Sequence, residues 1–139
     1  MKVYYLNDED LIASALFQKF LTDNPASGML KIRSFAASMA VPIKGLRVIV
    51  SSMLDDNTKV IFFEGVTDES GMIENIKLPA PKLSNDNLVA PVKTEYEIEA
   101  NYDPDNIKLI YKINMYEDVC VMQNINITPT LKVGGFNGR

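Results

Sequence analysis

Most of this chain alternates apolar and polar residues with a period of two, and this pattern constrains the fold more than any other feature. It begins near Gly28 and continues to Ile127, as expected for β-strands that bury one face and expose the other. Helical patterns are missing between these segments, which argues against an α/β layout. The apolar positions are Leu30, Ile32, Leu46, Val48, Val50, Ile76 and Leu78, then Tyr96, Ile98, Ala100, Tyr102, Ile107, Leu109, Tyr111, Ile113, Val119, Val121, Ile125 and Ile127.

Turn-forming residues separate these segments at regular intervals, and each cluster of them can reverse the chain. One long loop, LPAPKLSNDNLVAP at residues 78–91, contains three prolines and should run over the surface. A chain of 139 residues is long enough for one core. The sequence therefore predicts an all-β, seven-stranded antiparallel sandwich over residues 28–133. The turn clusters are residues 42–45, 55–57, 68–71, 103–105 and 114–118.

One amphipathic α-helix is expected before the first strand. Apolar side chains in residues 8–22 recur at three- and four-residue spacing, acidic residues occupy the first turn, and Asn24-Pro25 ends the pattern. We therefore expect residues 1–27 to form this helix and a connector. Residues 134–139 contain three glycines, which predicts a flexible C-terminal tail.

The helix is compatible with two functions that its sequence does not separate. It either covers a sheet or a sheet edge, which would protect the sandwich from aggregation, or docks on a partner protein through Leu16, Phe17 and Phe20. Phe136 in the tail is a further candidate for partner binding.

The composition excludes several kinds of site. The chain has no histidine and one cysteine, Cys120, so Ser-His and Cys-His nucleophile pairs and an intramolecular disulfide are ruled out. Lysine and arginine total 14 against 18 acidic residues, and the net charge of -4 without a basic tract argues against a nucleic-acid partner. We expect no enzymatic activity, no cofactor and no metal site, and we expect Cys120 to be a small buried residue of its strand.

The N-terminal residues predict synthesis in the cytoplasm without a signal peptide. Acidic groups stand where a secretory signal would have its apolar core, and no apolar run approaches the roughly 20 residues that span a bilayer. Release from the cell would then need another route, such as a particle that carries the protein.

Two groups of oxygen-bearing residues have plain structural explanations. The carboxylates of Glu64 and Glu74, or of Asp68 and Glu69, could approach each other across a hairpin, but acids in turns and edges need no catalytic role. The segment NYDPDN at residues 101–106 begins like a calcium loop. It lacks the loop's glycine and distal glutamate, which favours a proline-containing turn.

Three segments resemble the carboxypeptidase regulatory-like family of proteins. They are VPIKGLRVIV, GVTDESGMIENIKLP and EYEIEANYD, within residues 30–102, and the later VCVMQNINITP is similar to the closing strand of bacterial, particularly clostridial, members. The resemblance implies a transthyretin-like fold, in which a Pro-x-x-Gly turn precedes one strand and a Thr-Asp-x-x-Gly turn closes a hairpin. The matching residues are Pro42 and Gly45 in the first turn, Thr67, Asp68 and Gly71 in the second, and Tyr96 at the start of a strand.

These turn motifs have structural explanations. Proline fixes φ at Pro42, Gly71 permits the positive φ of a tight hairpin, and Asp68 can accept hydrogen bonds from nearby amides. The motifs identify a fold and imply no active site.

The expected function is therefore binding or assembly. A structural or adaptor subunit, contacting other proteins in an oligomer or larger assembly, fits a free-standing module without catalytic residues, and a phage tail or phage-tail-like particle is the assembly we expect. The alternative is a carbohydrate- or peptidoglycan-binding accessory module of the cell envelope, with Tyr96, Tyr102 and Tyr111 as a stacking platform. Alternation turns these tyrosines toward the core, and tryptophan is missing, which weakens that alternative.

Overall fold

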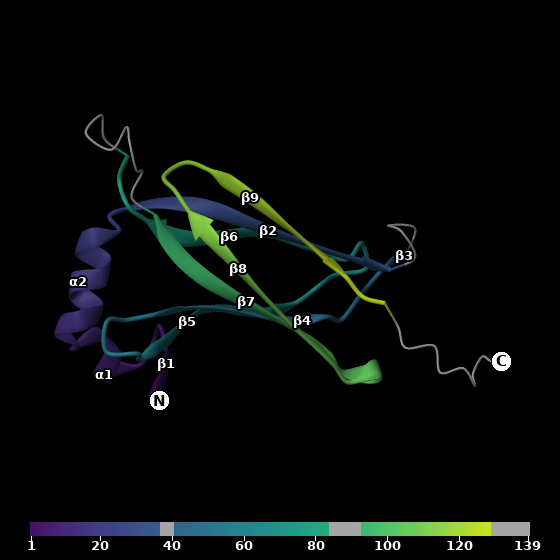
Figure 1. Ribbon diagram of the computed structural model, residues 1–139, viewed down its shortest axis with the longest axis horizontal. Coiled ribbons are helices and arrows are strands. Elements are labelled where there is room, and N and C mark those ends of the chain that lie inside the picture. The colour runs from purple at the N-terminus through teal and green to yellow at the C-terminus, as the bar shows by residue number, and fades with distance from the viewer. Residues whose placement is uncertain (37–40, 84–92, 129–139) are drawn as a thin grey trace.

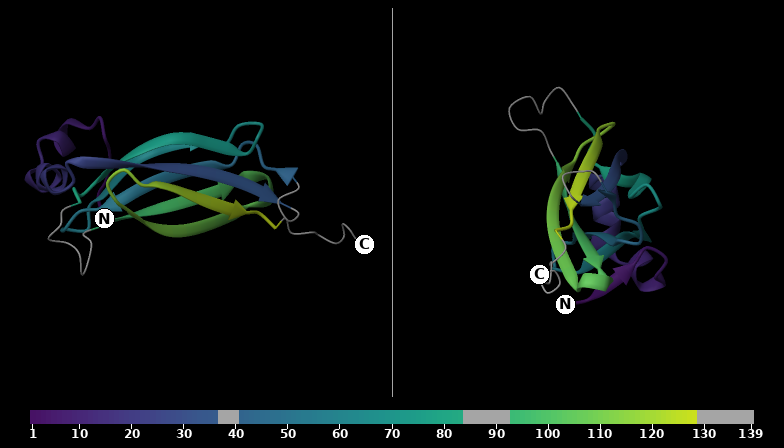
Figure 2. Two further views of the ribbon diagram at one scale, coloured as in Figure 1. Left: turned by 90° about the horizontal axis from the view of Figure 1, so that it is seen from above. Right: turned by 90° about the vertical axis from the view of Figure 1, so that its right-hand side faces the viewer.

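A computed structural model describes residues 1–36, 41–83 and 93–128 and shows two β-sheets packed face to face (Figure 1, Figure 2). Two short helices lie at one end of this sandwich, and the end of the last strand lies at the other. The elements are β1 (Val3–Tyr5), α1 (Glu9–Ile12), α2 (Ala15–Asp23), β2 (Ala26–Ala36), β3 (Val41–Pro42), β4 (Arg47–Met53), β5 (Lys59–Val66), β6 (Met72–Ala80), β7 (Thr94–Tyr102), the 3-10 helix η2 (Asp103–Asp105), β8 (Ile107–Met115) and β9 (Cys120–Asn126).

The five-stranded sheet has the order β1-β5-β4-β7-β8, and the four-stranded sheet consists of β3, β2 and β6 with β9 paired to β2. Neighbouring strands are antiparallel, except that β1 with β5 and β2 with β9 are parallel. The mainly β two-sheet sandwich is confirmed, but the expected seven antiparallel strands are not the full set. β1 and β3, with three and two residues, are too short to show alternation, and alternation does not encode strand direction.

The core lies between the two sheets, where every second side chain points inward. Val48 and Ile98 of the five-stranded sheet face Leu30 and Ile32 of the four-stranded sheet, and all four are fully buried. Tyr96 is buried with them, as its place in the alternation predicts. Burial of this apolar surface is the main stabilising contribution to the fold.

The N-terminal helical segment is broken into two helices, which differs from the single helix expected for residues 8–22. α1 ends at Ile12 and α2 begins at Ala15, because Ser14 has an extended backbone and starts a new helix. The Ser14 hydroxyl oxygen accepts the backbone N–H of Phe17 at 3.3 Å, which is the bond of an N-cap residue. α2 ends before Asn24, as predicted.

The first residues also belong to the sandwich. β1 pairs with β5, and β2 begins at Ala26, so residues 1–27 contain a sheet strand in addition to the expected helix and connector. The end of the predicted sandwich and the predicted tail, residues 129–139, lie outside the described residues. Among the helices that the structure describes, none is long and apolar enough to cross a membrane.

The two predicted turns meet around one buried carbonyl group, that of Ile43. Its oxygen accepts the hydroxyl of Thr67 at 2.6 Å and the hydroxyl of Ser34 at 2.8 Å. Thr67 Oγ1 in turn accepts the backbone N–H of Leu46 at 3.0 Å. Ser34 and Thr67 are almost fully buried, so these bonds fix the turn at residues 42–45 against the hairpin that follows β5.

The hairpin turn follows the expected chemistry. Asp68 Oδ1 accepts the backbone N–H groups of Ser70 and Met72, at 2.9 and 3.0 Å. Gly71 has a φ of +74°, and a Cβ atom at this position would overlap the carbonyl oxygen of Ser34. Glycine is therefore required here for its backbone conformation and for the close approach of β2.

Replacing Gly71 by alanine should destabilise the fold more than replacing Gly45. Both glycines have positive φ, +74° and +82°, so alanine at either position costs about 1–2 kcal/mol of left-handed strain. Only at Gly71 does the new methyl group meet backbone, because nothing lies within 4 Å of the equivalent position at Gly45. Overpacking adds about 1–3 kcal/mol at Gly71. Urea unfolding measures both losses, and equal losses would contradict the role of close approach.

Candidate functional site

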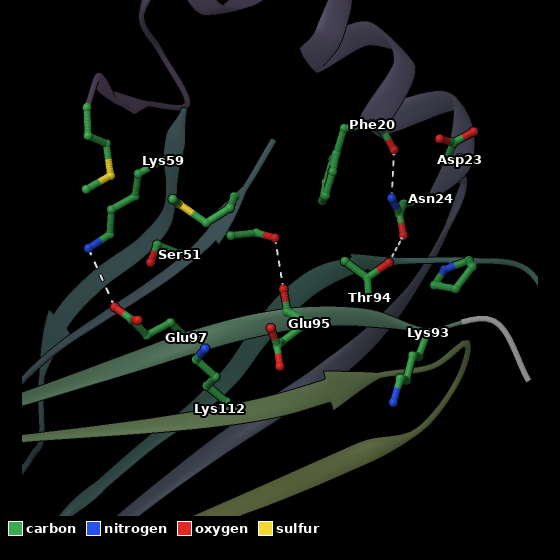
Figure 3. A pocket seen from close by; sticks show the side chains of 14 residues that line it. Phe20, Asp23, Asn24, Ser51, Lys59, Lys93, Thr94, Glu95, Glu97 and Lys112 are labelled. Atoms are coloured by element: carbon green, nitrogen blue, oxygen red, sulfur yellow. Dashed lines mark hydrogen bonds and ion pairs between the residues drawn. The ribbon is translucent and has the colours of Figure 1, made fainter. Parts of the chain in front are cut away.

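The main cleft of the described residues lies where α2 meets the five-stranded sheet, and it has a volume of about 740 Å³ (Figure 3). The end of α2, the end of β4 and the starts of β5 and β7 form its walls, and one side chain of β8 reaches it. It is lined by six charged side chains together with polar and apolar ones. The charged residues are Asp23, Lys59, Lys93, Glu95, Glu97 and Lys112.

The positive charges of three lysines balance the negative charges of three carboxylates in this cleft. Lys59 Nζ lies 3.6 Å from Glu97 Oε2, and both side chains are less than one-third exposed. The sheet register also places Lys112 directly opposite Glu97 on the neighbouring strand. Glu97 is therefore flanked by two cations, which leaves it electrostatically satisfied.

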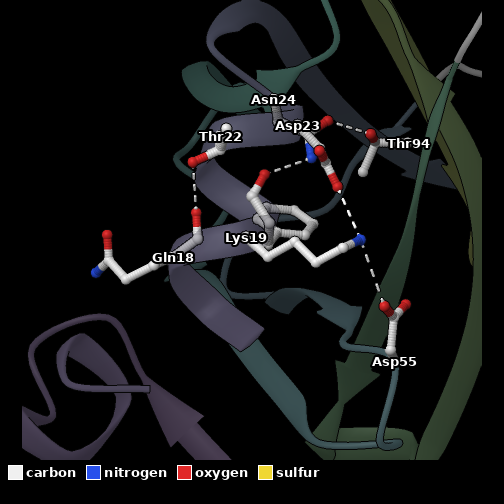
Figure 4. A network of polar contacts seen from close by, with 8 residues as sticks. Gln18, Lys19, Thr22, Asp23, Asn24, Asp55 and Thr94 are labelled. Carbon is white, nitrogen blue, oxygen red and sulfur yellow. Dashed lines mark hydrogen bonds and ion pairs between the residues drawn. The ribbon is translucent and has the colours of Figure 1, made fainter. Parts of the chain in front are cut away.

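A second polar network holds α2 to the start of β7 (Figure 4). Asn24 is buried, its Nδ2 donates to the Phe20 carbonyl at 2.8 Å, and its Oδ1 accepts the hydroxyl of Thr94. On the surface, Lys19 Nζ lies 3.1 Å from Asp23 and 3.6 Å from Asp55. These contacts explain the polar residues at this end of the cleft without a bound ligand.

The cleft contains no nucleophile paired with a base among the described residues. Ser52 Oγ donates to the backbone carbonyl of Glu95 at 2.9 Å, and Ser51 is buried. The described part of the chain also holds no group of three or more acidic or cysteine residues that could bind a metal ion. Chemically, the cleft offers hydrogen bonds and paired charges.

The helix residues predicted to bind a partner pack against the sandwich. Phe17 is 5% exposed, in a cluster with Leu11, with Leu54 directly after β4 and with Val60 of β5. Leu16 and Phe20 are half-buried against this cluster, and the Phe20 ring lies 5.5 Å from that of Phe62 on β5. α2 therefore packs against the sandwich, and docking of the helix on a partner stays a prediction. Phe17 is no exposed docking residue, and Phe136 lies outside the described residues.

The tyrosines of the carbohydrate alternative form no surface platform. Tyr96 is buried, and its hydroxyl donates to the Pro79 carbonyl at 2.6 Å. Tyr102 and Tyr111 are half-buried and pack against the core. Stacking on a sugar needs an exposed ring face, which these rings lack.

The candidate carboxylates are not brought together as pairs. Glu64 lies in the five-stranded sheet and accepts the hydroxyl of Tyr5 at 3.1 Å, whereas Glu74 lies in the four-stranded sheet and pairs with Lys31 at 3.6 Å. Asp68 bonds the turn backbone, as described above. Glu69 points to Lys44, with 3.5 Å between the charged atoms.

Within NYDPDN, Asn101 and Tyr102 end β7, and Asp103–Asp105 form the 3-10 helix η2, which is followed by Asn106 with a φ of +53°. This single helical turn links β7 to β8, close to the proline-containing turn expected. Asparagine tolerates the left-handed conformation better than most residues, which explains its place after the turn.

The sequence pattern did not predict the open sheet edge at β9, and the expected burial of Cys120 is wrong. Within the described residues, β9 pairs only with β2, and it lies outermost in Figure 1. Cys120 is exposed, because alternation turns Val121 and Ile125 inward instead. Met122 is 47% exposed on the same face as Cys120. The available signal was the strand's own sequence, CVMQNIN, which has no charge and no proline.

This chain is similar in fold to proteins of known structure. No protein-family model matches this chain, and no curated protein matches it. A 5-hydroxyisourate hydrolase from Klebsiella pneumoniae superposes with a TM-score of 0.51 and 17% identity, covering 73% of this chain and 90% of the hydrolase. The chain has a transthyretin-like fold. An (S)-allantoin synthase superposes with a TM-score of 0.51 and 12% identity, covering 81% of this chain and 45% of the synthase. At these identities the likeness concerns the fold alone.

Truncating Phe17 tests whether α2 is part of the fold. Phe17→Ala should destabilise the protein by about 3–5 kcal/mol, because it opens a cavity under α2. Ile12→Ala is the control, since Ile12 is also apolar but 52% exposed, and it should change stability by at most about 0.5 kcal/mol. Urea unfolding measures both. A loss at Phe17 no larger than that at Ile12 would contradict the covering role.

Tyr96 should make the protein less stable in strong alkali. Burial raises the pKa of its hydroxyl above the ordinary value, so above about pH 10 the unfolded chain releases a proton that the folded protein keeps. The ionisation of Tyr96 should therefore not affect stability below that pH, and stability should fall as pH rises beyond it. In Tyr96→Phe this alkaline fall should be smaller, with about 1 kcal/mol lost at neutral pH from the missing hydrogen bond. Unfolding curves from pH 7 to 11 measure both effects; identical alkaline slopes would contradict them.

Proposed function

We propose that this protein is a non-enzymatic structural or adaptor subunit that acts by binding other proteins. The observation that carries the proposal is the edge formed by β9 (Cys120–Asn126), called the β9 edge below. Its seven residues contain no charge and no proline, and Met122 is 47% exposed on it. An exposed edge strand is a template for another strand, and proteins that stay monomeric protect such edges.

The other edges within the described residues carry protection. β8 has Lys108 and Lys112, and β6 has Glu74, Lys77 and Pro79 together with a bulge opposite β2. β1 and β3 are only three and two residues long. Charge, proline, irregularity and short length are the usual means of preventing edge-to-edge pairing. β9 has none of them, which supports an edge that is covered in the working protein.

The described residues of the cleft include no nucleophile paired with a base, which supports the non-enzymatic part of the proposal. Lys59 and Glu97 pair with each other, Ser52 donates to the main chain, and the chain has no histidine to serve as a base. The names hydrolase and synthase belong to the two similar structures, whose 17% and 12% identities carry no activity to this chain.

Within the transthyretin-like fold, we propose that this chain belongs to the carboxypeptidase regulatory-like family and is of the clostridial type. The turn at residues 42–45 and the Thr67, Asp68 and Gly71 hairpin support it, since each residue makes the contact that its motif needs. A phage tail or phage-tail-like particle as the assembly stays a prediction from the sequence.

Isolation of the native complex tests this function. The tagged chain, produced at its natural level in its own host, should elute in a complex of defined stoichiometry by size-exclusion chromatography with light scattering and quantitative mass spectrometry. Met122→Lys should release the chain from that complex, because it puts a charge on the β9 edge.

Ile110→Lys is the matched control, since Ile110 is 53% exposed on the opposite sheet's edge strand, and this variant should stay bound. A chain found only as a free monomer, or one released equally by both substitutions, would contradict the proposal.

A further inference from the structure

The backbone of β9 has hydrogen-bonding groups that point away from its only described neighbour. The Met29 N–H donates to the Val119 carbonyl, and the Ile127 N–H donates to the Phe35 carbonyl, both at 2.9 Å. These bonds direct the odd-numbered residues of this segment toward β2. Backbone groups alternate along a strand, so those of the even-numbered residues point to the open edge. The even-numbered residues are Cys120, Met122, Asn124 and Asn126.

Among the described residues, the only side-chain bond to these outward groups is local. Gln123 Nε2 donates to the Asn124 carbonyl at 2.9 Å, and this contact is exposed to solvent. An amide side chain satisfying the carbonyl of the next residue is easily displaced, because water can take its place on either group. The edge is therefore accessible to another strand that can form the complete series of backbone hydrogen bonds with it.

We infer that the β9 edge pairs with the β9 edge of a second copy of this chain, antiparallel and centred on Gln123. The inference rests on the proposed function, because it names the occupant of the same edge. The two four-stranded sheets then form one continuous sheet across a twofold axis.

The length and sequence of β9 favour a second copy. Centring on Gln123 uses the whole strand: Met122 faces Asn124 of the second copy, and Cys120 faces Asn126, so all four outward residues form hydrogen-bonded pairs. The inward-facing Val121 and Ile125 then meet across the axis as an apolar pair, a favourable cross-strand combination. If the centre of the pairing moved by one residue, one outward-facing residue of β9 would lie opposite a residue outside the strand of the second copy.

Charge also favours a second copy at this edge. Twofold pairing brings each strand against its own sequence, and β9 has no charged residue to repel its equivalent. Pairing β8 with itself about Ile110 would instead place Lys108 against Lys112, and like charges directly opposite each other are destabilising. The β9 edge is thus the long edge of the described sandwich that is compatible with its own copy.

Removing one outward N–H tests the pairing. The purified wild-type chain should show twice the mass of one chain by light scattering, and Met122→Pro should be monomeric at the same concentration. Proline is tolerated where a strand's N–H faces away from its sheet, so the melting temperature should stay close to that of the Met122→Ala control. Met122→Ala keeps the N–H and should stay dimeric.

Cys120 provides a register test that does not depend on the proline variant. Residues in a hydrogen-bonded antiparallel pair have Cα atoms about 5.5 Å apart, which is within disulfide range. Asn126→Cys places a second thiol opposite Cys120 of the other copy and should give a covalent dimer on mild oxidation. Asn124→Cys lies opposite Met122 and should crosslink far less.

A wild-type chain that is monomeric up to high micromolar concentration would overturn the inference. A dimer that survives Met122→Pro while Asn126→Cys and Asn124→Cys crosslink equally would also overturn it. Failure here is distinguishable from failure of the proposed function. A monomeric pure chain whose native complex still depends on Met122 would assign the edge to a different protein, whereas a monomer in both experiments would reject both.

Discussion

The buried carbonyl of Ile43 is the contact on which the arrangement of the two sheets depends. Ile43 lies between β3 of one sheet and β4 of the other, and it receives the hydroxyls of Ser34 and Thr67. Each of these buried hydroxyls would cost about 1–3 kcal/mol if it lost its partner. The close approach of Gly71 brings β2 within reach of this carbonyl. One small polar cluster therefore sets how the chain passes between the sheets, and the apolar core fills the space that it leaves.

The sequence predicted those features that depend on neighbouring residues. Alternation located the buried faces, because side-chain direction in a strand has a period of two. The Thr67–Asp68–Gly71 turn was predictable because each residue has a distinct conformational or hydrogen-bonding property. Ser34 was missed, since its function depends on a turn that is distant in the chain. The break at Ser14 was missed because a serine in a helical pattern reads equally as an interior residue or a cap.

The residues that line the candidate site could not be predicted from the sequence. Lys59, Glu97 and Lys112 of the cleft come from three strands, and Asn24 comes from the end of α2. The sequence periodicity of a strand does not reveal which strands lie beside it in the sheet, so this grouping was not predictable. The burial of Cys120 was predicted wrongly for a related reason. A cysteine between two valines fits either face, and the buried face is the one that the five-stranded sheet covers.

The proposed function lies at the periphery of the sandwich. α2 closes one end through Phe17 and Phe20, whose rings continue through Phe62 to Tyr96 in the core. This end is thus integrated with the fold, and on its surface Lys19 pairs with Asp23 and Asp55. β9 has the opposite character: its inner side is part of the sheet, and its outer side has no neighbouring strand among the described residues. The same sandwich can therefore serve different proteins through different edges.

The parallel pairing of β2 with β9 also has a consequence for how the chain acquires its structure. Met29 pairs with Cys120, roughly 90 residues further along the sequence, whereas β4 pairs with β5, and β7 with β8, the next strand of the chain in each case. Contacts between distant residues form slowly because a long loop must close first. During synthesis β2 emerges early and keeps one side uncovered until β9 has left the ribosome. The four-stranded sheet is therefore the late and aggregation-sensitive half of this protein, and the five-stranded sheet can assemble before it.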